Sequence, residues 1–253
     1  MRKIQNYIAG ELVAPVAAQY MDNINPSTGE VYSLIPDSEA HDVELAVAAA
    51  KEAFPAWSSC GAETRANYLN KIADLIDDNL DRLALAESID NGKPVSLAKT
   101  VDIPRASANF RFYASGVQHF AAESHYMEGE AINYTKRSAV GVAGCISPWN
   151  FPLAIFTGQI SAALAAGNAV AAKPAETTPL IAEFAVNLMY QAGVPETALQ
   201  LFAGQGSIVG AALSADPKIN GVTFTGSTAT AQHINRSMAQ HLDPFAPLIA
   251  ETG

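Results

Sequence analysis

The segment that decides the fold runs from residue 139 to residue 176 and reads AVGVAGCISPWNFPLAIFTGQISAALAAGNAVAAKPAE. It begins with an apolar run at residues 139–146 and ends with a second one at 169–172, each short enough for a buried strand. Between them the pattern predicts a helix that begins near Leu153. Two short apolar strands joined by a helix indicate a parallel sheet with helices on its faces.

The same alternation continues to the last residues of the sequence. Strands are predicted at residues 199–202, 221–224 and 248–250, and helices at 179–191, 208–213 and 228–241. The predicted fold class is therefore α/β, a Rossmann-like doubly wound parallel sheet with flanking helices. Residues 131–137 alternate apolar and polar side chains, so a β-strand pair is also expected at about residues 130–146.

Composition narrows the class of function. A formal net charge of −10 argues against a nucleic-acid partner, which needs clustered basic residues. Two cysteines, Cys60 and Cys145, are too few for a disulfide framework, so a reducing, cytoplasmic location is expected. The first residues do not resemble a signal peptide, and no apolar run is long enough to cross a membrane. The histidines show no metal-ligand spacing, so no metal site is expected.

Two glycine-containing turns compete for the phosphates of a dinucleotide. Residues 204–210, GQGSIVG, follow a strand and open a helix, although the last glycine comes one position late for the G-x-G-x-x-G fingerprint. Gly226-Ser227-Thr228 also follows a strand, and its amides and hydroxyls would face an anion at a helix N-terminus. The spacing leaves these two turns about even. For either one alone, a tight connection without a ligand is the simpler interpretation.

Four polar side chains follow predicted strands. Lys173 and Glu176 come just after the strand at 169–172, where a surface ion pair is the simplest interpretation of either residue alone. Asn150 lies between Trp149 and Phe151, which we expect to shield it from solvent; it would either cap the following helix or donate to an oxyanion. Glu251 ends an apolar strand, where partial desolvation would raise its pKa toward the range of a general base.

Four motifs carrying these residues together resemble the NAD(P)-dependent aldehyde dehydrogenase superfamily over nearly the whole chain. They are Pro148-Trp149-Asn150-Phe151-Pro152, Lys173-Pro174-Ala175-Glu176, Phe224-Thr225-Gly226-Ser227 and Glu251-Thr252-Gly253. The resemblance implies that residues 1–253 form the dinucleotide-binding domain of such an enzyme. It also implies a role for the strand pair at about 130–146 in oligomerisation.

The resemblance also assigns roles to single residues. Lys173 and Glu176 would bind the adenosine ribose, and because a carboxylate there repels a 2′-phosphate, NAD is favoured over NADP. The remaining cofactor residues implied are Phe224, Gly226 and Ser227 for the pyrophosphate, Gly206 and Ile146 for the adenosine, and Pro148 and Trp149 for the nicotinamide. Asn150 would stabilise the oxyanion, and Glu251 would activate the water that hydrolyses a thioester.

The nucleophilic cysteine of the family does not match either cysteine of this chain. The resemblance places it beyond Gly253, so the catalytic cysteine domain is expected to be absent from the chain. Cys145 is interpreted as a buried small hydrophobe and Cys60 as a helix-linker residue. The partners implied are a small aldehyde and either further copies of the chain or a complementing catalytic half.

The expected function is NAD-dependent oxidation of an aldehyde to a carboxylic acid. From about Cys145 onward the sequence is similar to the glutamate-semialdehyde dehydrogenase part of proline-utilisation proteins, whereas the first half, with Asn6-Tyr7-Ile8-Ala9-Gly10, is more similar to muconic-semialdehyde dehydrogenases. Two alternatives stay open: a stand-alone NAD-binding module, and a structural fragment that has kept the fold without the ligand.

Overall fold

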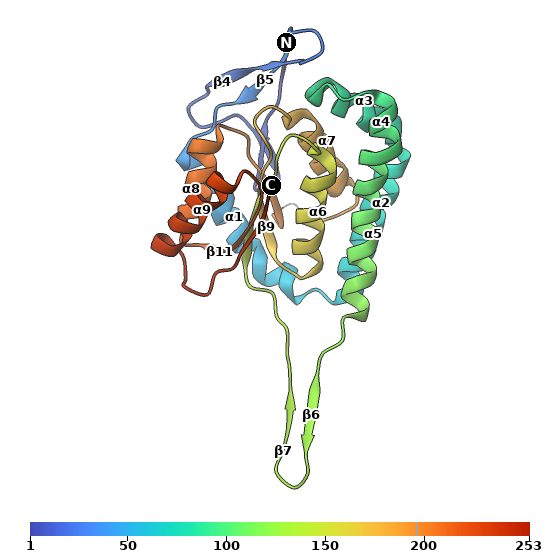
Figure 1. Ribbon diagram of the computed structural model, residues 1–253, viewed down its shortest axis with the longest axis vertical. Helices are drawn as coiled ribbons and strands as arrows, with labels where there is room; N and C mark the ends of the chain where they lie inside the picture. The colour runs from blue at the N-terminus through green and yellow to red at the C-terminus, as the bar shows by residue number, and fades with distance from the viewer. Residues whose placement is uncertain (196) are drawn as a thin grey trace.

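A mostly parallel sheet runs through the middle of the molecule, with helices packed on both of its faces (Figure 1). The structure is a computed structural model that describes residues 1–195 and 197–253. The strands of this sheet, in spatial order, are β12 (Leu248–Thr252), β11 (Ile219–Gly226), β8 (Val142–Ile146), β9 (Ala169–Lys173), β10 (Leu199–Leu201), β2 (Asn6–Ile8) and β3 (Glu11–Val13). The strands from β12 to β10 run parallel, and β2 and β3 add an antiparallel edge.

The strand order confirms the doubly wound fold. From β8 the chain first builds β9 and β10 on one side, and then returns to place β11 and β12 on the other side. The reversal lies between β8 and β11, and a doubly wound sheet opens a crevice for ligands at such a point. Every position of β9 is buried, as expected for a parallel strand covered on both faces.

Each face of the sheet has its own apolar core. One core is built by α2 (Ala62–Asp78), α3 (Leu80–Asn91), α5 (Ile103–His119), α6 (Pro152–Ala165) and α7 (Pro179–Gln191). The other is built by α1 (Ala40–Ser59), the π-helical turn η2 (Gly206–Gly210), α8 (Ala211–Ala215) and α9 (Thr228–His241). Figure 1 shows these two groups of helices on opposite sides of the strands. The crossover helices α6 and α7 are predominantly buried, which explains their nearly continuous apolar sequences.

Between α3 and α5 the chain forms short helical pieces. They are α4 (Val95–Leu97) and the π-helical turn η1 (Ala98–Asp102), which leads directly into α5. Pro104 stands in the first turn of α5, directly after the π-helical turn η1. Near the N-terminus a small separate sheet contains β1 (Arg2–Lys3), β5 (Val31–Pro36) and β4 (Tyr20–Ile24).

The protruding strand pair exists, but its predicted boundaries are wrong. The hairpin pairs β6 (Ser124–Met127) with β7 (Ala131–Tyr134), and it extends away from the rest of the molecule (Figure 1). The strand expected to be its second member, at residues 139–146, is instead the central strand β8. The burial of the two segments explains the difference: β7 is exposed at every position, whereas β8 is almost wholly buried. The alternation in residues 131–137 predicted a half-exposed strand, whereas β7 is exposed on both faces, and the pattern did not identify its partner strand.

Candidate cofactor and catalytic site

A cavity of about 740 Å³ opens at the carboxyl ends of β8, β9 and β11, beside the reversal in strand order. We call it the switch-point cavity. Every residue that the sequence analysis proposed for a cofactor lines it: Ile146, Pro148, Trp149, Lys173, Glu176, Gly206, Phe224, Gly226 and Ser227. These residues come from distant parts of the sequence and meet because parallel strands end at the same edge of a sheet.

Lys173 and Glu176 form a close ion pair in the wall of this cavity. Lys173 Nζ lies 2.8 Å from Glu176 Oε2, and the lysine is only 3% exposed, which rules out a simple surface pair. Burial alone raises the pKa of the Glu176 carboxyl, but the charge and hydrogen bond of Lys173, with backbone N–H groups of Glu176 and Gly206, hold that pKa below its usual range. Glu176 is therefore a carboxylate, and its side chain is 45% exposed to the cavity.

Gly206 keeps this ion pair accessible. A β-carbon at position 206 would stand 3.5 Å from Lys173 Nζ and 3.8 Å from the nearer Glu176 oxygen. A larger side chain would then cover the two charged groups. Gly206 begins η2 and Gly210 ends it. Gly210 is the late glycine of the G-x-G-x-x-G match, and the π-helical turn accommodates it because such a turn contains more residues than an α-helical one.

Both candidate phosphate-binding turns line the same cavity. The structure therefore places close together the two turns between which the glycine spacing could not choose. Ser227 is the N-cap of α9, and its Oγ accepts a hydrogen bond from Thr230 N at 3.2 Å. At Gly226 a β-carbon would stand 2.5 Å from the ring of Phe224. Only glycine lets this aromatic ring lie against the turn, and the ring forms part of the cavity wall.

Asn150 lies in the loop between β8 and α6. The expectation that its aromatic neighbours shield it is wrong, because Trp149 is 61% and Phe151 is 41% exposed. Phe151, rather than Asn150, is the N-cap of α6. Asn150 Oδ1 accepts a hydrogen bond from Phe151 N at 3.1 Å, and in the described part of the chain its Nδ2 has no acceptor. The amide therefore keeps its donor end free, as an oxyanion-binding group must.

A second cavity, of about 680 Å³, adjoins the first on the α6 face of the sheet; we call it the Glu251 pocket. Thr225 lines both cavities, while Trp149 lines the first and Phe151 the second. Asn150 therefore lies in the sequence between a residue of the first cavity and a residue of the second, and it does not itself line either cavity. Glu251 is exposed, so the expected desolvation of its carboxyl is not found in this structure.

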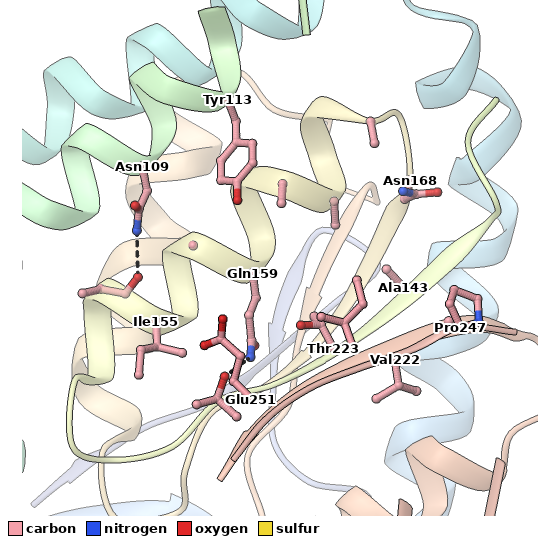
Figure 2. A pocket seen from close by; sticks show the side chains of 18 of the residues that line it. Asn109, Tyr113, Ala143, Ile155, Gln159, Asn168, Val222, Thr223, Pro247 and Glu251 are labelled. Carbon is pink, nitrogen blue, oxygen red and sulfur yellow. Dashed lines mark hydrogen bonds between the residues drawn. The ribbon is translucent and has the colours of Figure 1, made fainter. Parts of the chain in front are cut away.

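Gln159 is a polar residue of the Glu251 pocket that the sequence analysis missed. Figure 2 shows its side chain reaching from α6 toward Glu251. Its Nε2 donates to Ile146 O at 3.1 Å and to Thr225 Oγ1 at 3.3 Å, and Thr225 is the register partner of Glu251. Its Oε1 is buried without a hydrogen-bond partner among the described residues. The available signal was an amide within the predominantly apolar sequence of α6.

The two cysteines match their structural interpretation. Cys145 is fully buried in β8, and burial raises the pKa of its thiol to about 12, which suppresses the reactive thiolate. Cys60 is the C-cap residue that follows α1, and its Sγ contacts Ala56 O at 3.5 Å. Within residues 1–195 and 197–253, no group of acidic, histidine and cysteine side chains is arranged to hold a metal ion. The helices in the same ranges are all too short or too polar to cross a membrane.

Comparison with known proteins identifies the family of this chain. Residues 13–253 match the aldehyde dehydrogenase family. The chain is 44% identical to 2-aminomuconic semialdehyde dehydrogenase of Homo sapiens over 94% of its length, and 38% identical to 2-hydroxymuconic semialdehyde dehydrogenase of Pseudomonas sp. (strain CF600) over 97%. These matches cover 49% and 52% of the two relatives, so the chain spans about half their length.

Solved structures give the same result. PnpE from Pseudomonas sp. WBC-3 superposes on the whole chain with a TM-score of 0.95 and 37% identity, and the chain covers 51% of it. PnpE has also been solved in complex with nicotinamide adenine dinucleotide. The expected likeness to muconic-semialdehyde dehydrogenases is confirmed and extends through both halves of the sequence, while the likeness of the second half to glutamate-semialdehyde dehydrogenase stays a prediction. This chain belongs to the aldehyde dehydrogenase family.

Proposed function

We propose that this chain provides the NAD-binding part of an enzyme that oxidises an aldehyde to a carboxylic acid. The observation that carries the proposal is the buried Lys173–Glu176 ion pair, left uncovered by Gly206 inside the switch-point cavity. Together these groups offer a charged donor and an ionised acceptor to the two hydroxyls of a ribose. A relative solved with nicotinamide adenine dinucleotide supports the same choice of ligand.

NAD is the proposed cofactor in preference to NADP. The Glu176 carboxylate keeps its negative charge, because Lys173 and two backbone N–H groups stabilise it. A 2′-phosphate on the ribose would bring further negative charge against it. When bound, NAD supplies the acceptor for the hydride that leaves the substrate.

The residues of this chain would act on the aldehyde at the boundary of the two cavities. Asn150 would donate its free Nδ2 to the oxygen that gains negative charge, a contribution of roughly 3–4 kcal/mol for comparable donors. Glu251, which lines the adjoining pocket, would accept a proton from the water that releases the acid product. The nucleophilic cysteine is proposed to lie in the half of the enzyme that this chain does not span.

The substrate and partners are also proposals. A semialdehyde is the proposed class of substrate, because 2-aminomuconic and 2-hydroxymuconic semialdehyde dehydrogenases are among the relatives. The exposed hairpin of β6 and β7 is the proposed surface for oligomerisation. A reducing, cytoplasmic setting agrees with the two free thiols, Cys60 and Cys145.

Calorimetric titration with NAD and NADP tests the proposal. In Glu176→Gln the loss of the carboxylate should weaken NAD binding and relieve the repulsion of NADP, so the ratio of the two affinities should narrow about tenfold. Glu128→Gln at the exposed hairpin, far from the cavity, is the matched control and should leave both affinities unchanged.

Other results would refute separate parts of the proposal. No saturable NAD binding at millimolar concentrations would favour a structural fragment. NAD binding without aldehyde oxidation by the complete enzyme would favour a stand-alone binding module. An unchanged NAD/NADP ratio in Glu176→Gln would exclude Glu176 as the selecting group.

A further inference from the structure

Two side chains from the end of α3 and the turn after it hold the loop that carries Asn150. Asn91 Nδ2 donates to the carbonyl oxygen of Trp149 at 2.6 Å. Lys93 Nζ donates to the carbonyl oxygen of Asn150 at 3.2 Å. The carbonyl groups of two consecutive residues are thereby bonded to side chains at the end of α3 and in the turn after it, more than fifty residues earlier in the sequence.

Lys93 is itself held in place by two buried acidic side chains and an aromatic ring. Its Nζ lies 2.5 Å from Asp102 Oδ1 and 3.5 Å from Glu87 Oε1. It also lies 4.2 Å from the centre of the Phe151 ring, in the geometry of a cation–π contact. The lysine side chain is only 10% exposed, so its ammonium group is confined between the buried acids and the loop.

The charges of this cluster balance when one proton stays on the two acids. Both carboxyl groups are fully buried, and Glu87 Oε2 and Asp102 Oδ2 have no donor among the described residues. Burial, followed by the neighbouring Asp102, raises the pKa of Glu87 to about 8, so Glu87 keeps a proton that it can share with Asp102. One negative charge then faces the one positive charge of Lys93, which pins the ammonium group in place.

We propose that Asn91 and Lys93 are positioning residues that hold the Asn150 amide ready for the oxyanion, an inference that rests on the proposed role of Asn150. Fixing the carbonyls on both sides of the Asn150 nitrogen and α-carbon leaves its peptide little freedom to rotate. Its Oδ1 is occupied by Phe151 N, so the direction of Nδ2 follows from the direction of the backbone. A donor held in advance costs no reorganisation during the reaction, and small misplacements are expensive.

Amide hydrogen exchange in the folded protein gives a direct test. In Asn91→Ala, exchange at the Phe151 amide, which bonds Asn150 Oδ1, should rise about fivefold, the effect of losing one hydrogen bond. Asn187→Ala is the matched control: Asn187 Nδ2 also donates to a backbone carbonyl, that of Glu183, but this bond lies within α7 and does not involve the Asn150 loop. It should leave the exchange at Phe151 unchanged.

Lys93 needs a variant that leaves no unpaired buried charge. The triple replacement Lys93→Met, Glu87→Gln, Asp102→Asn removes the ammonium together with both acids. It should raise exchange at Phe151 as Asn91→Ala does. It should also increase acrylamide quenching of the exposed Trp149, while the fully buried Trp57 stays protected.

Kinetics of the complete enzyme separate positioning from mere ordering of the loop. In Asn91→Ala, kcat should fall about fivefold with little change in the NAD dissociation constant or in KM. Unchanged exchange in both variants, or faster exchange with unchanged kcat, would overturn the proposal. A wild-type protein that neither binds NAD nor oxidises aldehydes would refute the proposed role of Asn150 and, with it, this proposal. Exchange at Phe151 would still show whether Asn91 and Lys93 order the loop.

Discussion

Replacing Glu87 by glutamine should remove a large pH dependence of stability. Glu87 is fully buried, and its pKa rises from 4.5 to about 8 because burial and the neighbouring Asp102 both disfavour its charge. The unfolded chain releases this proton near pH 4.5, whereas the folded protein keeps it until about pH 8. Between these two values the unfolded state binds fewer protons, so the free energy of unfolding falls as the pH rises.

The magnitude follows from the two pKa values. With about 1.4 kcal/mol for each pH unit in the window, the full loss in the wild type is about 5 kcal/mol between pH 4.5 and pH 8. Glutamine has nearly the same shape and an amide that can still donate to Asp102, but it does not titrate. Titrating groups that are not coupled to Glu87, such as Asp90, are present in both proteins, so their contributions cancel in the difference.

Urea unfolding followed by circular dichroism at several pH values from about 5 to about 9 would measure this difference. The stability of Glu87→Gln relative to the wild type should improve steadily by several kcal/mol as the pH rises, and level off above about pH 8. A difference that stays constant over this range would show that Glu87 is ionised in the folded protein. The charge balance proposed around Lys93 would then be wrong.

Two further predictions concern the cavity wall and the thiols. In Gly226→Ala the new β-carbon would stand 2.5 Å from Phe224, so the ring must leave the cavity wall at a cost of about 1–3 kcal/mol. NAD affinity measured by calorimetry should therefore fall roughly 5- to 150-fold. The control Gly116→Ala has open space around the new β-carbon and should leave NAD affinity unchanged. Equal binding by Gly226→Ala would show that Phe224 does not shape the site. In the native protein a thiol reagent should label Cys60 and spare Cys145, because burial raises the pKa of Cys145 to about 12; rapid labelling of both thiols, counted by mass spectrometry, would contradict the buried position of β8.

The order of strands and helices was predictable from the sequence because it depends on near neighbours along the chain. The runs at residues 139–146 and 169–172 correspond to β8 and β9, and the Gly226 turn stands at the end of β11 as expected. Once the strands are parallel, their carboxyl ends share one edge of the sheet. This shared edge, together with the family resemblance of the motifs, located the residues of the switch-point cavity from the sequence.

Exposure and long-range contacts were decided only by the tertiary structure. The sequence could not show that β7 pairs with β6 instead of β8, that Trp149 leaves Asn150 open to solvent, or that Lys93 reaches the Asn150 carbonyl. Each of these depends on segments that meet across the fold, and the local pattern of a strand or loop carries no record of which distant segment will cover it. The sequence alone determined which chemical groups stand at the edge of the sheet. Only the folded chain determined how these groups are held and how much water reaches them, because the burial and the hydrogen-bond partners of a side chain depend on which distant segments pack against it.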